Sequence, residues 1–371
     1  MNTKSYLSRF ESKRALFQVT QSESIQNLVA LRMHINRMRV KDRISEELDP
    51  SRIEKMLTRF GLASAKIEAR ASEIIDYKLK LPEQAEACVL FKEAELPSLD
   101  ARMELYRKSV SSVFREFYPE NAALPGHLVH VTCTGYLAPS PAQIRMAELK
   151  ARTQVTHAYH MGCYASLPAL RIAQGFEGVT DIVHTEVCSL HFDPLSLVPE
   201  QIVVQSLFAD GHIRYRLDHE PPIEGFQIEA LMEKIIPESS EMMTWTPGKS
   251  GFHMTLDRRV PELLKANLNG FIDEILDLAK IERSESLIFA IHPGGPKIIE
   301  AVEEALNLFR HQSTESHEVL RKHGNMSSAT LPHVWKTILE NRERRDGQAV
   351  VSLAFGPGLT LSGGVFRLCR S

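Results

Sequence analysis

Residues 156–175 read THAYHMGCYASLPALRIAQG, an extended run that becomes helical close to Cys163. TQVTHAYHMG is typical of a strand, and the helix that follows has Pro168 in or beside its first turn, where a missing N–H does least harm. A second buried strand is predicted directly afterwards, at TDIVHTEVCSLHF. A strand, a helix and another strand in succession predict an α/β protein.

The same alternation continues towards the C-terminus. We expect the first 115 or so residues to be mainly helical, and strands and helices to alternate from HLVHVTCTGY onward. LDHEPPIEG, at Leu217–Gly225, carries adjacent prolines and predicts a linker. Strand, helix and strand patterns recur beyond it, in SLIFAIHPGG, PKIIEAVEEALNLF and VVSLAFGPGLTLSGGVFRL. The sequence therefore predicts two related α/β halves, residues 1–222 and 223–371.

Composition excludes several classes of protein. The chain has 371 residues, 43% of them apolar, and 44 basic residues against 47 acidic ones, so it favours neither nucleic acid nor an anionic membrane as a partner. It has no run of 18 apolar residues, and its N-terminus lacks the apolar core of a secretory signal. Its five cysteines form no CxxC pair. We interpret it as a reduced, cytoplasmic protein without a disulfide framework or a structural zinc site.

Cys163 supports two hypotheses. His157, His160 and Cys163 have the spacing of metal ligands on a helix, but the extended character of this run would place the two histidines on opposite faces. Alternatively, Cys163 is a nucleophile. A cysteine at the N-terminus of a helix lies among free N–H groups at the positive end of the dipole, which predicts a lowered thiol pKa.

Two further residues supply what a nucleophilic cysteine needs. His292 stands where the apolar strand SLIFAI stops and a glycine-rich turn starts, so its imidazole can enter a site while its backbone is anchored. Asn325, in RKHGNMSSAT, follows a glycine and precedes small residues. Its carboxamide is a neutral hydrogen-bond donor. These residues favour the nucleophile over the metal.

Five motifs occur in order along the chain: MGCYASLPALRIA, SLFADG, IHPGGPKIIEAVEEAL, HGNMSSAT and FGPGLTLSG. In order and separation they resemble type III polyketide synthases, the chalcone synthase-like family of the thiolase superfamily. The resemblance runs from about Pro97 to the C-terminus and is weaker before it. It implies a thiolase fold, with two similar α/β halves in a five-layered αβαβα core, and a homodimer.

The resemblance also implies a reaction. Cys163 would take an acyl starter from a thioester, paired with His292 as thiolate and imidazolium. His292 and Asn325 would then hydrogen bond the malonyl thioester carbonyl and stabilise the enolate that loss of CO₂ leaves. Attack of this enolate on acyl-Cys163 extends the chain by two carbons. The scheme uses no metal and no bound organic cofactor.

Substrate-binding residues follow from the same resemblance. Phe208 in SLFADG and Phe252 in SGFHMTL match gating aromatic residues beside the cysteine. Cys133 and Thr134 in VTCTGY, with His191 in CSLHF, align with residues that shape the elongation cavity. His191 replaces a smaller residue of plant members, which would narrow or polarise this cavity.

Cations for the phosphates of coenzyme A are sparse. Lys55 and Arg59 match two of those in the family, but a third is not evident around Ala63–Ala65. The starter donor is therefore either acyl-CoA or an acyl carrier protein, with a malonyl thioester as extender.

Two other functions stay open. One is an initiating ketoacyl synthase-like enzyme that performs a single condensation on carrier-bound substrates, which HPGG and GNMSSA disfavour. The other is a non-catalytic thiolase-fold subunit that binds acyl groups, which the presence of Cys163, His292 and Asn325 disfavours.

Overall fold

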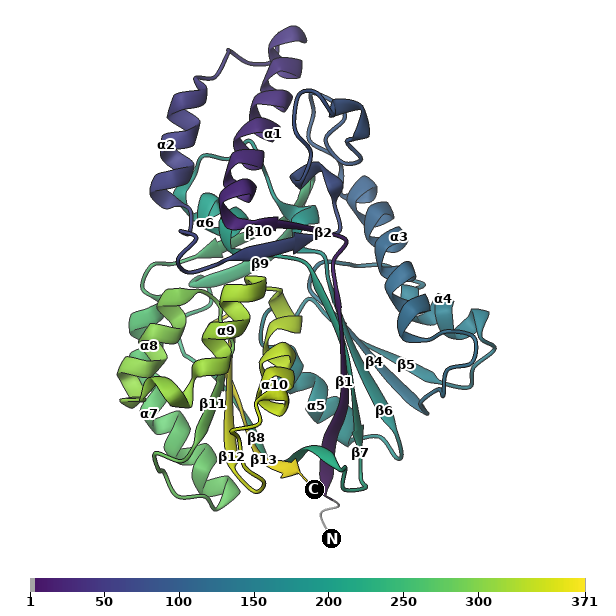
Figure 1. Cartoon of the computed structure of the whole chain (residues 1–371), viewed down its shortest axis with the longest axis vertical. Helices are drawn as coiled ribbons and strands as arrows, with labels where there is room; N and C mark the ends of the chain where they lie inside the picture. Colours follow the sequence, from purple (N-terminus) through teal and green to yellow (C-terminus); the bar gives the residue numbers. More distant parts are fainter. Residues whose placement is uncertain (1–3, 371) are drawn as a thin grey trace.

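The computed structural model describes residues 4–370 and is built around a nine-stranded mixed sheet (Figure 1). The strand order is β11-β12-β13-β8-β1-β7-β6-β4-β5. In chain order these strands are β1 (Ser5–Arg14), β4 (His127–Thr132), β5 (Gln154–Tyr159), β6 (Thr180–Glu186), β7 (Gly211–Asp218), β8 (Glu224–Ile235), β11 (Ile288–Ile291), β12 (Ala349–Gly356) and β13 (Thr360–Arg370).

The sheet contains one pattern twice. From β4 through β6 and β7 to β1, the first pair is parallel and the next two are antiparallel. The same sequence of pairings leads from β11 through β12 and β13 to β8. The two copies meet where β1 pairs with β8. The expected pair of similar α/β halves is therefore present, while their division after residue 222 stays a prediction.

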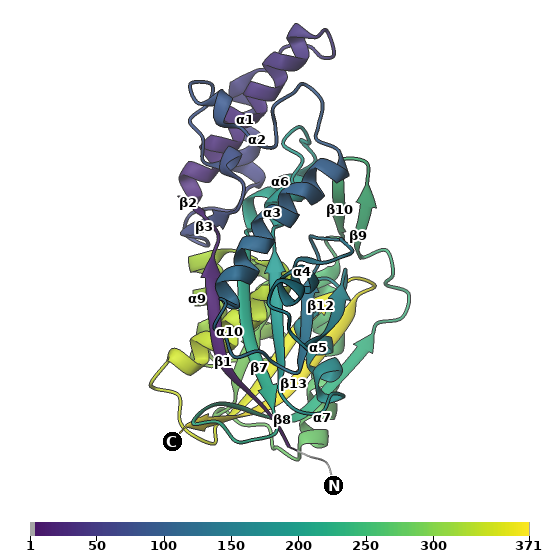
Figure 2. The same ribbon diagram turned by 90° about the vertical axis from the view of Figure 1, so that its right-hand side faces the viewer.

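Helices complete five layers. Helices α5 (Ser166–Gln174) and α10 (Thr330–Glu340) lie between the two halves of the sheet, because α5 contacts β4 and β13 and α10 contacts β7 and β11. Helices α3 (Leu99–Phe117) and α4 (Pro141–Glu148) cover the outer face of one half, and α7 (Val260–Ala279) and α8 (Pro296–Leu306) cover that of the other (Figures 1 and 2). This is the αβαβα order that we expected.

A projecting arm and two small sheets lie at one end of this core (Figures 1 and 2). The arm is a hairpin of α1 (Gln21–Lys41) and α2 (Pro50–Phe60). The remaining elements are β2 (Phe17–Thr20), β3 (Ala69–Ser72), α6 (Pro199–Leu207), β9 (Met243–Gly248), β10 (Gly251–Leu256) and α9 (Thr314–His323).

Two local expectations are wrong. The N-terminal region is not mainly helical throughout, because Ser5–Arg14 forms β1 at the centre of the large sheet. Its buried part spans Ser5–Ser8 before polar, half-buried residues follow, so its apolar run is too short to predict a strand. The strand expected across TDIVHTEVCSLHF stops at Glu186, and Cys188–His191 forms a short 3-10 helix instead.

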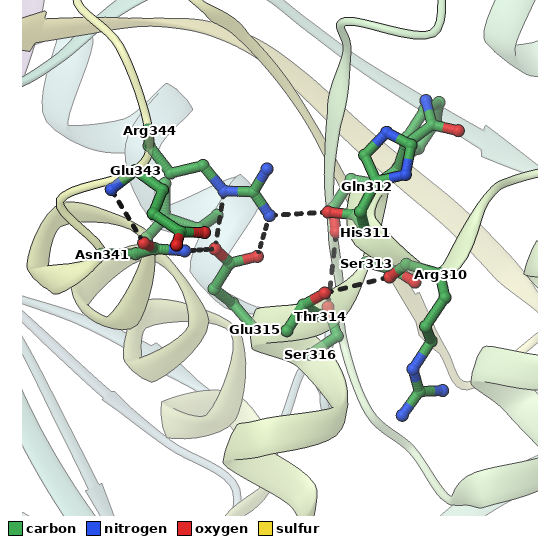
Figure 3. Close-up of polar contacts among 12 residues, drawn as sticks. Arg310, His311, Gln312, Ser313, Thr314, Glu315, Ser316, Asn341, Glu343 and Arg344 are labelled. Carbon is green, nitrogen blue, oxygen red and sulfur yellow. Dashed lines mark hydrogen bonds and ion pairs between the residues drawn. The ribbon is translucent and has the colours of Figure 1, made fainter.

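A buried ion pair closes the hairpin of α9 and α10 (Figure 3). Arg344 donates to both carboxylate oxygens of Glu315, each at 2.7 Å, and Asn341 donates to the same carboxylate. Glu315 is on the first turn of α9, and Arg344 follows α10. Since Asn325 lies in the connection between these helices, the ion pair holds the hairpin at the end opposite to Asn325.

Candidate active site

Cys163 lies in a tight turn between β5 and α5. The preceding Gly162 has φ +90°, and a Cβ atom there would lie 2.4 Å from Cδ of Pro357, in the turn between β12 and β13. Gly356 is equally constrained, because its Cβ would lie 2.0 Å from the ring of Tyr164. The FGPG motif of one half is thus packed directly against the cysteine turn of the other.

The environment of Cys163 contradicts the lowered pKa that we expected. Cys163 is 8% exposed, and burial raises the pKa of its thiol to about 12. Hydrogen bonds with Ser327 and Asn325 lower this pKa, whereas the charge of Glu186 raises it further. Desolvation therefore outweighs these hydrogen bonds, and the thiol is protonated at neutral pH.

Asn325 lies beside Cys163 with its carboxamide in a defined orientation. The carboxamide oxygen accepts hydrogen bonds from the Ser327 N–H at 2.8 Å and the Thr330 hydroxyl at 3.2 Å. The NH₂ group is therefore the end that can donate towards the sulfur or a substrate. Backbone pairing with Phe208 holds Asn325 in place.

His292 is buried at the end of β11. Its backbone N–H donates to Leu353 of β12, as we expected for an imidazole anchored at a strand end. Neither ring nitrogen has a hydrogen-bond partner, and burial lowers the pKa of the imidazole to about 3. Among residues 4–370 no hydrogen bond joins His292 to Cys163, so the thiolate–imidazolium pair is absent from this structure.

The turn after His292 nevertheless approaches Asn325. A Cβ atom on Gly295 would lie 3.7 Å from the side chain of Leu207, whose carbonyl accepts the backbone N–H of Asn325. The turn after His292 and the segment of Asn325 thus both contact Leu207. Burying an imidazole with two unpartnered nitrogens costs folding free energy. A role of His292 beyond packing would explain why this cost is tolerated.

A small, largely apolar cavity opens at Cys163. The cavity is lined by Cys163 together with the three residues predicted to shape it, Cys133, Thr134 and His191, and the two predicted gating residues, Phe208 and Phe252. Its volume is about 30 Å³. His292 and Asn325 lie outside this lining. Other lining residues were not predicted, among them Ser327, Cys188, Met243, Trp245 and Met254.

His191 narrows the cavity rather than polarising it. Its Nδ1 accepts the Phe252 N–H at 3.1 Å and its Nε2 donates to the Thr134 carbonyl at 2.7 Å, so both nitrogens are engaged. Its ring stacks on Phe252 with centroids 4.2 Å apart. Burial lowers the pKa of His191 to about 3, so that the ring is neutral.

Glu186 is a buried carboxylate that the sequence interpretation missed. It accepts the Cys133 N–H at 3.0 Å and the Thr134 hydroxyl at 2.8 Å, and it also accepts the Ser328 hydroxyl from the other half. Burial raises the pKa of Glu186, which these hydrogen bonds oppose. The available signal was a carboxylate near the end of the strand predicted in TDIVHTEVCSLHF, which the sequence analysis expects to be buried.

Lys55 and Arg59 lie on the exposed side of α2, away from the cavity lining. The next cation along the chain, Lys66, forms an exposed ion pair with Glu300 of α8. That Lys55 and Arg59 bind the phosphates of coenzyme A therefore stays a prediction.

The residues of the metal hypothesis have other partners. His157 hydrogen bonds the Ser140 hydroxyl at 2.9 Å, and His160 hydrogen bonds the Trp245 carbonyl at 2.8 Å. Within residues 4–370, no three His, Cys, Asp or Glu side chains are grouped so as to hold a metal ion. In the same range every helix is too short or too polar to cross a bilayer.

Comparison with known proteins gives sequence relatives along most of the chain. Residues 227–369 match the family of chalcone and stilbene synthases, C-terminal domain. A 3,5-dihydroxyphenylacetyl-CoA synthase of Streptomyces toyocaensis is 28% identical over 329 residues, which cover 83% of this chain and 84% of that protein. A probable polyketide synthase 1 of Dictyostelium discoideum is 31% identical over 252 residues, 64% of this chain but only 8% of that longer protein.

Solved structures share the whole fold. The C-terminal type III polyketide synthase domain of Steely1 from Dictyostelium superposes with a TM-score of 0.82 at 21% identity, over 99% of both chains. The 1,3,6,8-tetrahydroxynaphthalene synthase of Streptomyces coelicolor gives a TM-score of 0.77 at 20% identity, over 99% of this chain and all of that one. The predicted thiolase fold is confirmed.

Proposed function

We propose that the chain is a type III polyketide synthase that loads an acyl starter on Cys163 and extends it by decarboxylative condensation with a malonyl thioester, which the match of residues 227–369 and the similarity to a 3,5-dihydroxyphenylacetyl-CoA synthase support. The observation that carries this proposal is the position of Cys163, whose sulfur lines a cavity beside the carboxamide of Asn325. A homodimer, and coenzyme A or a carrier protein as thioester donor, belong to the same proposal.

Loading begins from a neutral thiol and a neutral imidazole. The pKa of Cys163 is about 12 and that of His292 about 3, so a free thiolate does not accumulate before substrate arrives. We propose that His292 takes the thiol proton while the sulfur attacks the thioester carbonyl. The bond from the carbonyl carbon to the donor sulfur breaks, and the proton passes to the departing thiolate.

Condensation then uses His292 and Asn325 as hydrogen-bond donors to the malonyl thioester. The carboxylate carbon of the malonyl group leaves as CO₂, and the enolate oxygen that remains accepts hydrogen bonds from His292 and from the NH₂ of Asn325. Each such donor contributes about 3–4 kcal/mol to the transition state. The enolate carbon attacks acyl-Cys163, the sulfur departs, and one proton from solvent restores the thiol. None of these steps needs a metal ion or an organic cofactor.

A specific observation favours a second candidate. A cavity of about 30 Å³ is small for a growing polyketide, which suits an initiating ketoacyl synthase-like enzyme that condenses once. Both candidates share the acyl-Cys163 intermediate, and they differ in the number of extensions.

Intact-protein mass spectrometry after incubation with acetyl-CoA, acetyl-carrier protein and malonyl-CoA tests the proposal. We expect one acyl adduct on the wild type and none on Cys163→Ala. Cys88→Ala is the matched control, because Cys88 is buried but lies outside the cavity, and it should be acylated normally. Adducts that persist in Cys163→Ala would contradict the assignment of the nucleophile, and no adduct from any donor would favour the non-catalytic subunit.

A further inference from the structure

The hairpin of β9 and β10 forms one wall of the cavity. Trp245 opposes Met254 in its register, and Met243 and Phe252 lie two residues from them on their own strands. Because side chains alternate between the faces of a strand, these four residues share one face, and all four line the cavity. The wall is therefore built from large apolar side chains.

Two aromatic residues of this wall, Trp245 and Phe252, pack with the ring of His191. The ring of His191 is stacked on that of Phe252 at an interplanar angle of 6°. Trp245 stands perpendicular to both rings, with centroids 5.6 Å from each. This edge-to-face arrangement is favourable for aromatic side chains.

Hydrogen bonds hold these rings in place. The indole N–H of Trp245 donates to the Cys133 carbonyl at 2.7 Å, and the Trp245 carbonyl accepts from His160 at 2.8 Å. His191 is bonded through both ring nitrogens. Moving Trp245 aside would leave the Cys133 carbonyl without this partner and expose a ring that is now packed.

The remaining space sets a limit on the acyl chain. A cavity of about 30 Å³ holds roughly two water molecules, and each extension adds two carbons and an oxygen to the chain. We infer that the site accepts short acyl starters, stops after one or two extensions, and has Trp245 as the residue that determines this limit. The inference rests on the proposed function and adds to it the class of substrate, namely thioesters of short acyl chains.

The test compares acyl-chain length in loading and in product. Wild-type enzyme is incubated with acetyl-CoA, hexanoyl-CoA or decanoyl-CoA and malonyl-CoA, and both the acyl-enzyme and the products are measured by mass spectrometry. We expect acetyl to load at least about tenfold faster than hexanoyl, because a few additional methylenes in a filled pocket cost that much. Trp245→Ala should reduce this preference and lengthen the main product by at least one two-carbon unit.

Two further variants separate ring volume from other effects. Trp245→Phe keeps an aromatic ring without the indole N–H, so we expect products closer to those of the wild type. His253→Ala removes a ring from the exposed face of the same hairpin, and it should leave the chain-length preference unchanged.

Several outcomes would overturn the inference. Efficient loading of decanoyl by the wild type, or wild-type products with three or more extensions, would do so without any variant. So would a folded Trp245→Ala enzyme with an unchanged product range. Failure of the proposed function has a different signature, since no acyl-enzyme would then form from any thioester.

Discussion

Lowering the pH from 7 to 5 should strongly destabilise the protein through its buried histidines. Burial lowers the pKa of His184, His191 and His292 to about 3 and that of His333 to about 4. In the unfolded chain these side chains titrate near 6.5. Below that pH the unfolded state binds protons that the folded state does not, so stability falls as the pH falls.

The size of this effect follows from the pKa differences. Between pH 7 and pH 5 each of the four histidines removes about 2 kcal/mol from the free energy of unfolding, or about 7–8 kcal/mol together. Asp210 acts in the opposite direction, because burial raises its pKa to about 6. Between pH 7 and pH 5 it adds about 1 kcal/mol to the free energy of unfolding. The net loss from these five groups is about 6 kcal/mol, of which about 2 kcal/mol is lost between pH 7 and pH 6. The free energy of unfolding of a whole protein domain is only about 5–15 kcal/mol.

Urea unfolding at pH 7, 6 and 5 measures this loss. The fluorescence of Trp335, which is fully buried, and far-UV circular dichroism report the transition. His333→Gln should recover about 2 kcal/mol of the difference between pH 7 and pH 5, whereas His311→Gln, at an exposed histidine, should recover none. A free energy of unfolding that is flat from pH 7 to pH 5 would refute the reasoning.

Three other predictions concern the catalytic groups and the buried ion pair of Glu315 and Arg344. Asn325→Ala should slow release of labelled CO₂ from malonyl thioester by about 10²–10³ while Cys163 still becomes acylated; unchanged release would exclude the donor role. Alkylation of Cys163 by iodoacetamide, followed by peptide mass spectrometry, should rise about tenfold per pH unit from pH 7 to 9, and a plateau in this range would contradict the raised pKa. Glu315→Gln should cost about 3 kcal/mol in urea unfolding, because Arg344 loses its buried counter-charge. Glu318→Gln, which breaks a surface pair, should cost under about 1 kcal/mol, and equal costs for the two variants would contradict a stabilising role of the Glu315–Arg344 pair.

Local patterns predicted most of the fold. The strand before His292 is a short apolar run, both strands before Cys163 and His292 end near a glycine, and the helices after them have clear periodicity, so these elements could be assigned from neighbouring residues. β1 could not, because its burial depends on β7 and β8, which lie about 200 residues away in the sequence.

Contacts between the two halves were beyond the sequence interpretation. Gly162 needs to be a glycine because of Pro357, and no local pattern links these positions. Trp245 was missed for a similar reason, since only the register of β9 with β10 places it on the same face as Phe252, in the lining of the cavity at Cys163. The family resemblance brought forward residues inside the motifs that carry it, and Trp245 lies outside those motifs.

The pKa of Cys163 shows why a helix terminus is an incomplete guide to reactivity. The field of a helix falls off within its last turn and is worth about 0.3–1 kcal/mol at an exposed site, whereas full burial of an ionisable group shifts its pKa by several units. Desolvation raises the pKa of the Cys163 thiol and lowers that of the His292 imidazole, so both groups are neutral. A neutral thiol resists oxidation and alkylation. In the proposed reaction, proton transfer to His292 is therefore coupled to the attack on a thioester, which places activation of the sulfur in the presence of substrate rather than before it.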